Sequence, residues 1–332
     1  MTNRCRVGVM GVGHLGSIHA RLLKEIASAE LIGVYDVDQA RSATLAAELG
    51  FISFASPSQL LSSVDAAVIA ASTRAHYNLA LEAIAHQVNL FIEKPLADAP
   101  QRAREILQRC KDAGLKLGVG HIERFNRAVR ALEGFRVDPR FIEVHRLAAF
   151  TPRGADVAVI MDLMIHDLDL ILHWVKSPVK RLDAAGVAII SDTPDIANAR
   201  IAFENGCVAN VTASRISRHK MRKMRLFQDD AYISLDFIDG VAEVFRLAGP
   251  DEKGPPALEL GQIEKASQPR RILYLKPEAP QANALKLELE GFLQAILNNT
   301  PVPVSGEDGV RALELGKEIL SQIEGQGIKA KG

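Results

Sequence analysis

An aspartate and a histidine stand four residues apart in an otherwise apolar stretch, Met161–Val175, whose spacing predicts a helix. At 3.6 residues per turn, Asp162 and His166 fall on one face and can touch. A carboxylate beside an imidazole orients the ring and favours proton uptake, which is the chemistry of a general base. Asp169 and His173 continue that face, so a solvated polar face or a metal site are the alternatives. We expect no metal, because no nearby cysteine or glutamate completes a ligand set.

A lysine, Lys94, follows a second apolar run, Asn89–Ile92, which we predict to be a strand. In a parallel sheet the carboxyl end of such a strand faces the ligand crevice, so Lys94 could hydrogen-bond a reacting hydroxyl there. Pro95 biases Lys94 away from helical geometry and holds it at the strand end. The alternative is an exposed lysine in an ordinary loop.

A glycine-rich loop opens the chain and ends its first apolar run. Gly11 allows a tight turn, Gly13 lets the backbone approach a pyrophosphate, and Gly16 packs a helix against a strand. The N-terminus of that helix offers free N–H groups to phosphate. The residues expected to bind a dinucleotide here are Gly11, Val12, Gly13, His14, Leu15 and Gly16.

An acidic residue, Asp36, ends the next apolar run, twenty positions after Gly16. At this separation in the sequence a carboxylate is expected to accept hydrogen bonds from the adenosine ribose. The same carboxylate would repel a 2′-phosphate, so we predict NAD rather than NADP, although Arg41 lies close. Further cofactor contacts are expected from residues that follow strands, namely Thr73, His76, Glu93 and Lys94. For Thr73 and His76 the alternative is a role in capping the next helix.

A polar cluster follows the last predicted strand of the first third. Glu123, Arg124 and Asn126 could bind an oxygen-rich substrate, because the planar fork of arginine fits carboxylate or phosphate. They could instead cap the helix that follows. Arg153 is a further candidate for holding sugar or diphosphate. The basic run Arg215–Arg225 could reach a diphosphate, or could be a solvated turn or edge strand.

The composition argues against several function classes. Lysine plus arginine and aspartate plus glutamate number 40 each, so no global field attracts nucleic acid or membrane. The three cysteines form no C-x-x-C pair, which argues against a disulfide framework. No apolar run approaches the roughly 20 residues that span a bilayer. We expect a cytoplasmic protein with a small-molecule substrate and neither nucleic acid nor membrane as partner.

Strands and helices alternate through the first third and give way to strands separated by turns. The first pattern predicts a doubly wound parallel sheet, a Rossmann domain, over residues 1–122. The second predicts an α+β domain over residues 123–332 with an open, mostly antiparallel sheet, its last helix returning to the first domain. The strands expected in this domain are Lys180–Ile190, Ala197–Phe203, Cys207–Ile216, Met224–Phe227, Tyr232–Phe237 and Ala242–Leu247.

The order of three motifs resembles the Gfo/Idh/MocA oxidoreductase family over nearly the whole chain. The motifs are the loop Gly11–Gly16, the tripeptide at 93–95, and Asp162 followed by His166. The resemblance implies that Lys94, His166 and Asp162 serve hydride transfer at a sugar or cyclitol carbon, with either Lys94 or His166 as the base. It also implies a homodimer or homotetramer that packs through the open sheet.

Two segments, 120–126 and 161–167, are most similar to the UDP-N-acetylglucosamine 3-dehydrogenases within that family. Those enzymes oxidise C3 ahead of an aminotransferase, on a route to amide-linked lipid A chains. On this resemblance Lys94, Asp162 and His166 would also contact the substrate. The alternatives are a family enzyme for an inositol, a free sugar or a UDP-uronic acid, and a regulator that binds NAD without catalysis.

Overall fold

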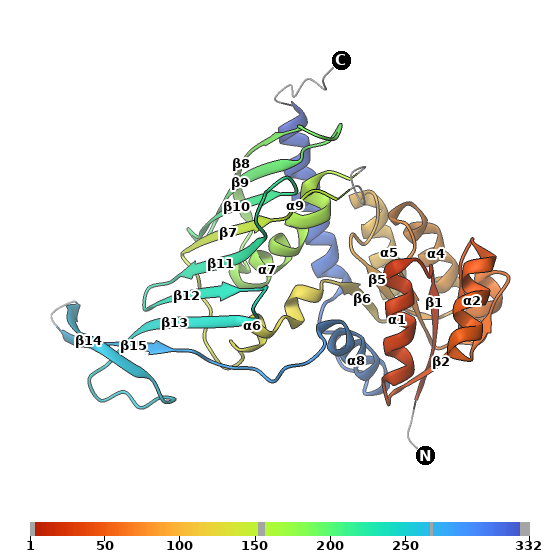
Figure 1. The fold of residues 1–332 in the computed structure, drawn as a ribbon, viewed down its shortest axis with the longest axis horizontal. Helices are drawn as coiled ribbons and strands as arrows, with labels where there is room; N and C mark the ends of the chain where they lie inside the picture. Colours follow the sequence, from red (N-terminus) through yellow and green to blue (C-terminus); the bar gives the residue numbers. More distant parts are fainter. Residues whose placement is uncertain (1–3, 152–156, 266–267, 326–332) are drawn as a thin grey trace. The chain divides into compact units, whose positions relative to one another are not determined.

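The computed structural model describes residues 4–151, 157–265 and 268–325 (Figure 1). Contacts divide the chain into two compact units. Unit 1 comprises Met1–Ile122 and Ala282–Glu314, and unit 2 comprises Glu123–Gln281 and Leu315–Gly332. No helix within the described ranges is long and apolar enough to cross a membrane.

Unit 1 is built on a parallel sheet of six strands. In spatial order the strands are β3 (Ile52–Ser53), β2 (Ala29–Tyr35), β1 (Cys5–Met10), β4 (Ala66–Ile69), β5 (Asn89–Glu93) and β6 (Leu117–Gly120). The strand order reverses between β1 and β4, and such a switch point opens a crevice at the carboxyl ends of the strands. The predicted doubly wound sheet is confirmed.

Helices pack on both faces of this sheet, because its strands are apolar on both sides. The helices of unit 1 are α1 (His14–Glu25), α2 (Gln39–Leu49), α3 (Pro57–Leu61), α4 (Thr73–Ala85), α5 (Pro100–Asp112) and α8 (Ala284–Leu297). One core joins α1, α2 and α8 to β1, and the tilted rings of Phe292 in α8 and Phe91 in β5 pack with centroids 5.6 Å apart. On the other face, Gly8 leaves room for Leu60 of α3.

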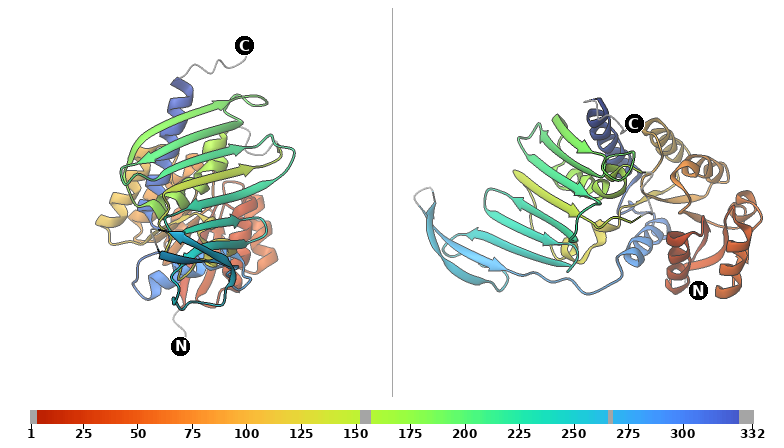
Figure 2. Two further views of the ribbon diagram at one scale, coloured as in Figure 1. Left: turned by 90° about the vertical axis from the view of Figure 1, so that its left-hand side faces the viewer. Right: turned by 45° about the horizontal axis from the view of Figure 1, so that its top comes forward.

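Unit 2 is built on a mixed sheet of nine strands (Figure 2). In spatial order they are β14 (Leu258–Lys265), β15 (Gln268–Leu275), β13 (Val241–Ala248), β12 (Ala231–Asp236), β11 (Met221–Phe227), β7 (Phe141–Leu147), β10 (Val208–Ser214), β9 (Ile196–Phe203) and β8 (Val179–Val187). Only β7 and β10 pair in parallel, so the expected open, mostly antiparallel sheet is confirmed.

The edge-strand interpretation of the basic run is wrong. Its second half is β11, which lies inside the sheet between β12 and β7. Met224 and Leu226 face the core of unit 2, whereas Lys223 and Arg225 face away from it. The alternation of apolar and basic residues therefore marks an interior strand with one polar face.

The helices of unit 2 pack against one face of its sheet. They are the 3₁₀ helix η1 (Ile122–Phe125, which begins one residue before the unit), α6 (Arg127–Arg130), the π-helical turn η2 (Ile160–Met164), and α7 (Ile165–Val175). The predicted uniform helix over 161–175 is therefore wrong in its first turn, which has π geometry. The last helix, α9 (Gly306–Gly325), begins in unit 1 and ends in unit 2. Its Gly306 and Gly309 lie against β6.

A buried arginine ties α7 to the sheet. Arg146 of β7 donates two hydrogen bonds to Asp167 of α7, at 2.7 and 2.8 Å, and one to Glu123 of η1 at 2.9 Å. Side-chain exposure is 3% for Arg146 and 1% for Asp167. Burial raises the pKa of the Asp167 carboxyl, although Arg146 opposes this effect. Removing Arg146 alone would therefore leave the buried carboxyl of Asp167 without its ion-pair partner.

We predict that Arg146→Met lowers the free energy of unfolding by about 3–5 kcal/mol, because one partner of a buried ion pair is lost. Arg225→Met is the matched control, since Arg225 on the neighbouring strand pairs with Glu143 at a half-exposed position. We expect the control to change stability by less than about 1 kcal/mol. Urea unfolding of both variants measures the difference, and equal losses would contradict a special role for the buried pair.

Candidate functional site

The glycine loop lies at the carboxyl end of β1, in the crevice of unit 1. Gly11 has φ of 88°, and a Cβ there would stand 2.5 Å from the backbone of Ala71. A Cβ at Gly16 would stand 1.8 Å from the carbonyl oxygen of Gly11. A Cβ at Gly13 would meet nothing within 4 Å, so this face of the loop is open. Gly13 is the N-cap of α1 and has no side chain that could accept a hydrogen bond from the first turn. The backbone N–H groups of that turn are therefore available for phosphate.

The carboxylate of Asp36 holds this loop from the end of β2. Its Oδ2 accepts the N–H of Val12 at 2.7 Å and its Oδ1 accepts the N–H of Asp38 at 2.9 Å. Arg41 lies 3.8 Å from Asp36 and 3.0 Å from Asp38, so two carboxylates compensate its charge. That arrangement favours ribose hydroxyls over a 2′-phosphate beside Asp36.

Two cavities that share Gly13 and Arg41 lie beside the loop, with volumes of about 320 and 580 Å³. The first is lined by Gly11, Gly13, Tyr35, Asp36, Val37, Arg41, Ala70, Ala71, Ser72, Ala75 and Leu79. Val12, Gly13 and His14 line the second, together with Ser17 and Arg41. An open glycine face, free helix N–H groups and a buried carboxylate next to an apolar cavity fit a dinucleotide. The side chain of Leu15 instead packs on the core, so only its backbone faces the loop.

Lys94 follows β5 and is supported by buried groups on either side. Glu93 Oε1 lies 2.7 Å from Nε2 of His19 in α1, and its Oε2 accepts the N–H of Lys94 at 3.3 Å. A Cβ at Gly120 would stand 2.7 Å from the Glu93 carboxylate, so a glycine is needed there. Glu93, expected to contact cofactor, is thus a buried support for Lys94. His19 escaped the sequence analysis, since its only signal is its place three residues after Gly16.

The two α4 candidates occupy different environments. Thr73 is half-buried at the first position of α4, after Ser72 of the cavity wall. His76 is buried, and its ring nitrogens lie 3.0 Å from the carbonyl oxygen of Pro95 and 3.1 Å from that of Ala71. Burial lowers the pKa of His76, although these carbonyls oppose the shift. His76 therefore joins the loops after β4 and β5 from inside the protein.

The proposed base and its partner lie in unit 2, one on each side of a helix junction. Asp162 belongs to the π-turn η2, and His166 lies in the first turn of α7; both are half-buried. A π-turn bonds residue i to i+5, so it interrupts the 3.6-residue period that placed Asp162 and His166 on one helix face, and their contact stays a prediction. Such turns are frequent at functional sites.

The other polar residues of unit 2 have partners inside the protein. Arg124 makes a two-point contact with Asp169 at 2.6 and 2.7 Å, and its third nitrogen faces His173. Asn126 caps α6 through the N–H of Ala128 and donates to the Glu123 carboxylate. These contacts fit the alternative of a local structural role, and a substrate role stays a prediction.

The remaining candidates separate by unit. The glycine loop, Asp36, Thr73, His76, Glu93 and Lys94 belong to unit 1, whereas Glu123, Arg124, Asn126, Asp162 and His166 belong to unit 2. Arg153 lies outside the described residues. Among the residues that the structure describes, no three histidine, cysteine or acidic side chains form a group that could hold a metal ion.

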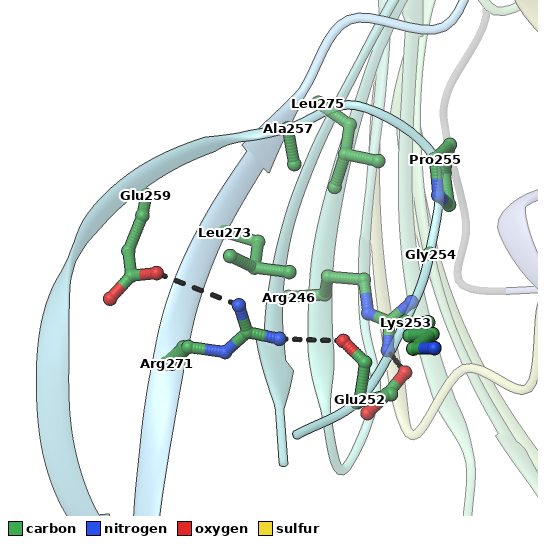
Figure 3. A pocket seen from close by; sticks show the side chains of 10 residues that line it. All are labelled: Arg246, Glu252, Lys253, Gly254, Pro255, Ala257, Glu259, Arg271, Leu273 and Leu275. Atoms are coloured by element: carbon green, nitrogen blue, oxygen red, sulfur yellow. Dashed lines mark hydrogen bonds and ion pairs between the residues drawn. The ribbon is translucent and has the colours of Figure 1, made fainter. Parts of the chain in front are cut away.

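A further cavity, of about 450 Å³, lies at the β14–β15 hairpin (Figure 3). Arg246 contacts Glu252, and Arg271 lies 3.6 Å from Glu259 and donates to the carbonyl oxygen of Glu252 at 2.6 Å. These arginines tie the loop after β13 to the hairpin. Carboxylate and carbonyl oxygens thus already accept hydrogen bonds from both arginines, which fits a structural role in holding the loop.

Comparison with known proteins finds matches over both units. The Gfo/Idh/MocA oxidoreductase family with an NAD-binding Rossmann fold matches residues 5–121, and the Gfo/Idh/MocA C-terminal domain matches residues 129–234. UDP-N-acetylglucosamine 3-dehydrogenase of Acidithiobacillus ferrooxidans is 37% identical over 321 residues, 96% of this chain and 97% of the relative. The structure of that relative covers 97% of this chain and 98% of its own, with a TM-score of 0.86 and 35% identity.

More distant relatives share the architecture. Myo-inositol 2-dehydrogenase of Thermotoga maritima is 26% identical over 338 residues, 96% of each chain. Scyllo-inositol dehydrogenase of Lactobacillus casei, solved with NAD(H) and scyllo-inositol, has a TM-score of 0.76 at 19% identity and covers 97% of this chain and 98% of its own. At that identity the likeness shows the shared fold.

We predict that Gly13→Ala weakens NAD binding by at least about tenfold, or about 1.4 kcal/mol, and leaves stability nearly unchanged. The added methyl group projects into open space at the pyrophosphate position and meets no protein atom. Gly16→Ala is the contrasting variant, since its Cβ collides with the backbone of Gly11 and should destabilise the fold. Calorimetric titration with NAD⁺ and urea unfolding separate the two effects. Unchanged NAD affinity in Gly13→Ala would contradict this loop as the phosphate site.

Proposed function

The chain belongs to the Gfo/Idh/MocA family of NAD-binding oxidoreductases, and from that premise we propose that it oxidises the C3 hydroxyl of UDP-N-acetylglucosamine to a ketone. The observation that carries the proposal is the 37% identity to a dehydrogenase of that substrate over 96% of this chain. The coarser conclusion, an NAD-dependent oxidoreductase, rests on the family match itself.

The reaction removes two groups from the sugar, a hydride from C3 and a proton from its hydroxyl. Bound NAD⁺ supplies the hydride acceptor. The chain must hold the hydroxyl and take its proton. Lys94 and His166 are the two candidates for the base, and in the proposed mechanism the one that does not take the proton hydrogen-bonds the same oxygen.

Each candidate has a neighbouring side chain that could position it. Lys94 follows β5, and its backbone N–H donates to Glu93, which in turn contacts His19. Asp162 is our candidate for orienting His166, because the two stand on successive turns at one helix junction. Arg124, Asn126 and Arg153 remain candidates for holding the sugar or diphosphate.

We place this reaction ahead of an aminotransferase, because a sugar ketone is the substrate class in which an amine replaces the carbonyl oxygen. Amino-sugar biosynthesis of the lipid A type would use such a pair. We propose a cytoplasmic location for the enzyme.

We also propose a homodimer or homotetramer through the face of the nine-stranded sheet that lies opposite α7, seen in Figure 2, left. A row of aromatic rings crosses five strands of that face, with neighbouring centroids 4.9–5.8 Å apart. The row consists of Phe141, Phe227, Tyr232, Phe245 and Tyr274, none of them buried. A half-exposed aromatic row suits a protein partner.

We predict that the purified protein converts UDP-N-acetylglucosamine and NAD⁺ to NADH and a 3-keto sugar nucleotide. Hydroxylamine in the assay traps the ketone for mass spectrometry, and NADH absorbance follows turnover. UDP-glucose and myo-inositol serve as comparison substrates, and an inositol-derived ketone would instead favour the activity of the Thermotoga relative. The absence of a ketone from UDP-N-acetylglucosamine would refute the proposed substrate.

We predict that Lys94→Met lowers kcat by about 10²–10⁴, the usual contribution of a positioned acid–base group. NAD⁺ affinity should stay nearly unchanged, because the glycine loop and Asp36 are untouched. Lys111→Met is the control, since Lys111 is an exposed lysine of the same unit that pairs with Glu307. Turnover of Lys94→Met at the wild-type rate would remove Lys94 from the mechanism.

A further inference from the structure

We propose that the buried ion pair of Arg215 and Asp195 positions the π-turn that carries Asp162, so that Arg215 is a positioning residue for the dehydrogenation. The inference rests on the proposed function for its catalytic consequence. Its structural part concerns unit 2 alone, to which all of these residues belong.

Arg215 differs from the rest of the basic run. It follows β10 directly, and its side chain is 6% exposed, whereas Arg218 and Lys220 are exposed. A buried arginine requires acceptors for its five N–H donors. The environment of Arg215 therefore decides what it does.

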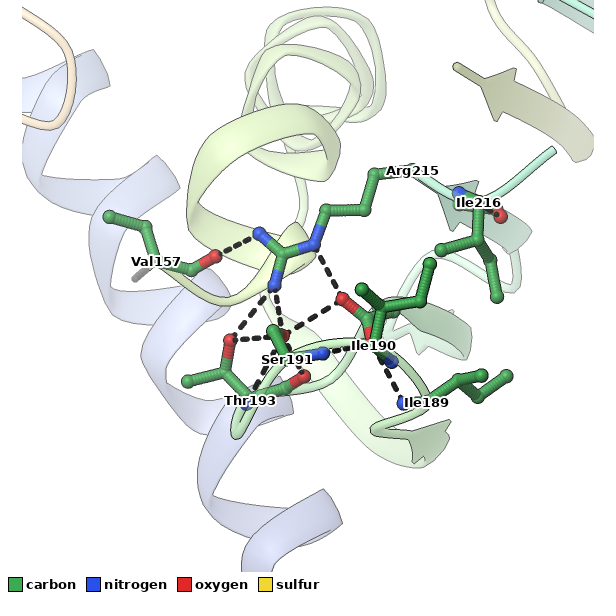
Figure 4. A network of polar contacts seen from close by, with 9 residues as sticks. Val157, Ile189, Ile190, Ser191, Thr193, Arg215 and Ile216 are labelled. Atoms are coloured by element: carbon green, nitrogen blue, oxygen red, sulfur yellow. Dashed lines mark hydrogen bonds and ion pairs between the residues drawn. The ribbon is translucent and has the colours of Figure 1, made fainter. Parts of the chain in front are cut away.

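The guanidinium of Arg215 contacts two segments (Figure 4). Its Nε donates to Asp195 Oδ1 at 2.7 Å, and its Nη2 donates to the hydroxyls of Ser191 at 2.7 Å and Thr193 at 3.0 Å. Its Nη1 donates to the carbonyl oxygen of Val157 at 2.5 Å. One rigid group thus joins the loop before β9 to the chain that enters the π-turn.

Asp195 is the fixed centre of this network. Its carboxylate is fully buried, and Oδ2 accepts the backbone N–H groups of Ile189, Ile190 and Ser191 at 2.7, 2.6 and 3.0 Å. Burial raises the pKa of Asp195, but these donors and Arg215 outweigh burial and hold its pKa well below the usual range. The carboxylate therefore stays charged, and the loop wraps around it.

The network reaches the π-turn through two anchors. Arg215 holds the carbonyl of Val157, and two residues later the N–H of Val159 donates to the carbonyl oxygen of Pro194 at 3.0 Å. The carbonyl of Ala158, between these anchors, accepts the N–H of Asp162 at 3.1 Å. The N–H of Asp162, inside the π-turn, thus bonds the carbonyl of a residue whose neighbours are both held.

Packing against α9 supports the same turn. Gly316 of α9 lacks a side chain, and a Cβ there would stand 3.0 Å from the sulfur of Met161. A π-turn is rare, so contacts from its surroundings must favour it over an α-turn. The Arg215 network and the close approach at Gly316 supply such contacts.

The test compares Arg215→Lys with the wild type. Lysine keeps the charge but lacks the planar fork that spans Asp195 and Val157 together. We expect kcat to fall by about 10- to 100-fold, the scale of a misplacement near 1 Å, while NAD⁺ affinity and KM for NAD⁺ stay unchanged. Arg200→Met is the control, because Arg200 is exposed on β9 and bonds only Asn210 in the described contacts.

Hydrogen–deuterium exchange provides a readout that needs no substrate. In Arg215→Lys we expect faster exchange in residues 157–166 and unchanged exchange in unit 1. Unchanged exchange in that segment, or wild-type kcat in the folded variant, would overturn the proposal. If Arg215→Lys does not fold, Thr193→Val removes one acceptor and keeps the ion pair. For Thr193→Val we expect a smaller fall in kcat and a smaller rise in exchange in residues 157–166. The absence of both changes would overturn the proposal.

The exchange result also separates this proposal from the proposed function. If the wild type makes no ketone from UDP-N-acetylglucosamine, the proposed substrate fails, and faster exchange in residues 157–166 still supports the positioning role. The kinetic comparison then uses whichever sugar or cyclitol the wild type oxidises.

Discussion

A carboxylate removed from water must be surrounded by donors, and this constraint shapes the surroundings of the candidate residues in each unit. Asp36 gathers backbone N–H groups and so fixes the glycine loop. Glu93 lies between His19 and the N–H of Lys94, and Asp167 receives Arg146. Each acid fixes the position of a segment or side chain beside it, because its oxygen atoms must lie at hydrogen-bonding distance from their donors. The chemistry thus depends on acids that take no part in it.

The sheet of unit 1 could be predicted because its strands are short apolar runs with helical patterns between them. The sheet of unit 2 was predicted less completely. β7 was missed because Arg146 occupies a core-facing position, which hides the alternation of an amphipathic strand. β14 and β15 were missed because they have almost no buried face to give a pattern.

The candidate site shows the same division between local and distant information. The glycine loop, Asp36 and Lys94 follow from spacing along the sequence, because turn geometry and strand ends are local. The pairing of Arg124 with Asp169 joins residues 45 positions apart, and no spacing rule could indicate it. The π-turn before α7 also escapes prediction, since it interrupts the 3.6-residue period on which helical faces are assigned.

The double use of Asp36 bears on how this protein could change over evolution. The carboxylate that disfavours a 2′-phosphate also holds the N–H of Val12, so one side chain serves both selectivity and loop architecture. A drift toward NADP could not proceed through the loss of this acid alone, because the phosphate loop would lose its support in the same step. Cofactor choice therefore cannot change independently of the loop structure. Another acceptor for the N–H of Val12 would have to arise first.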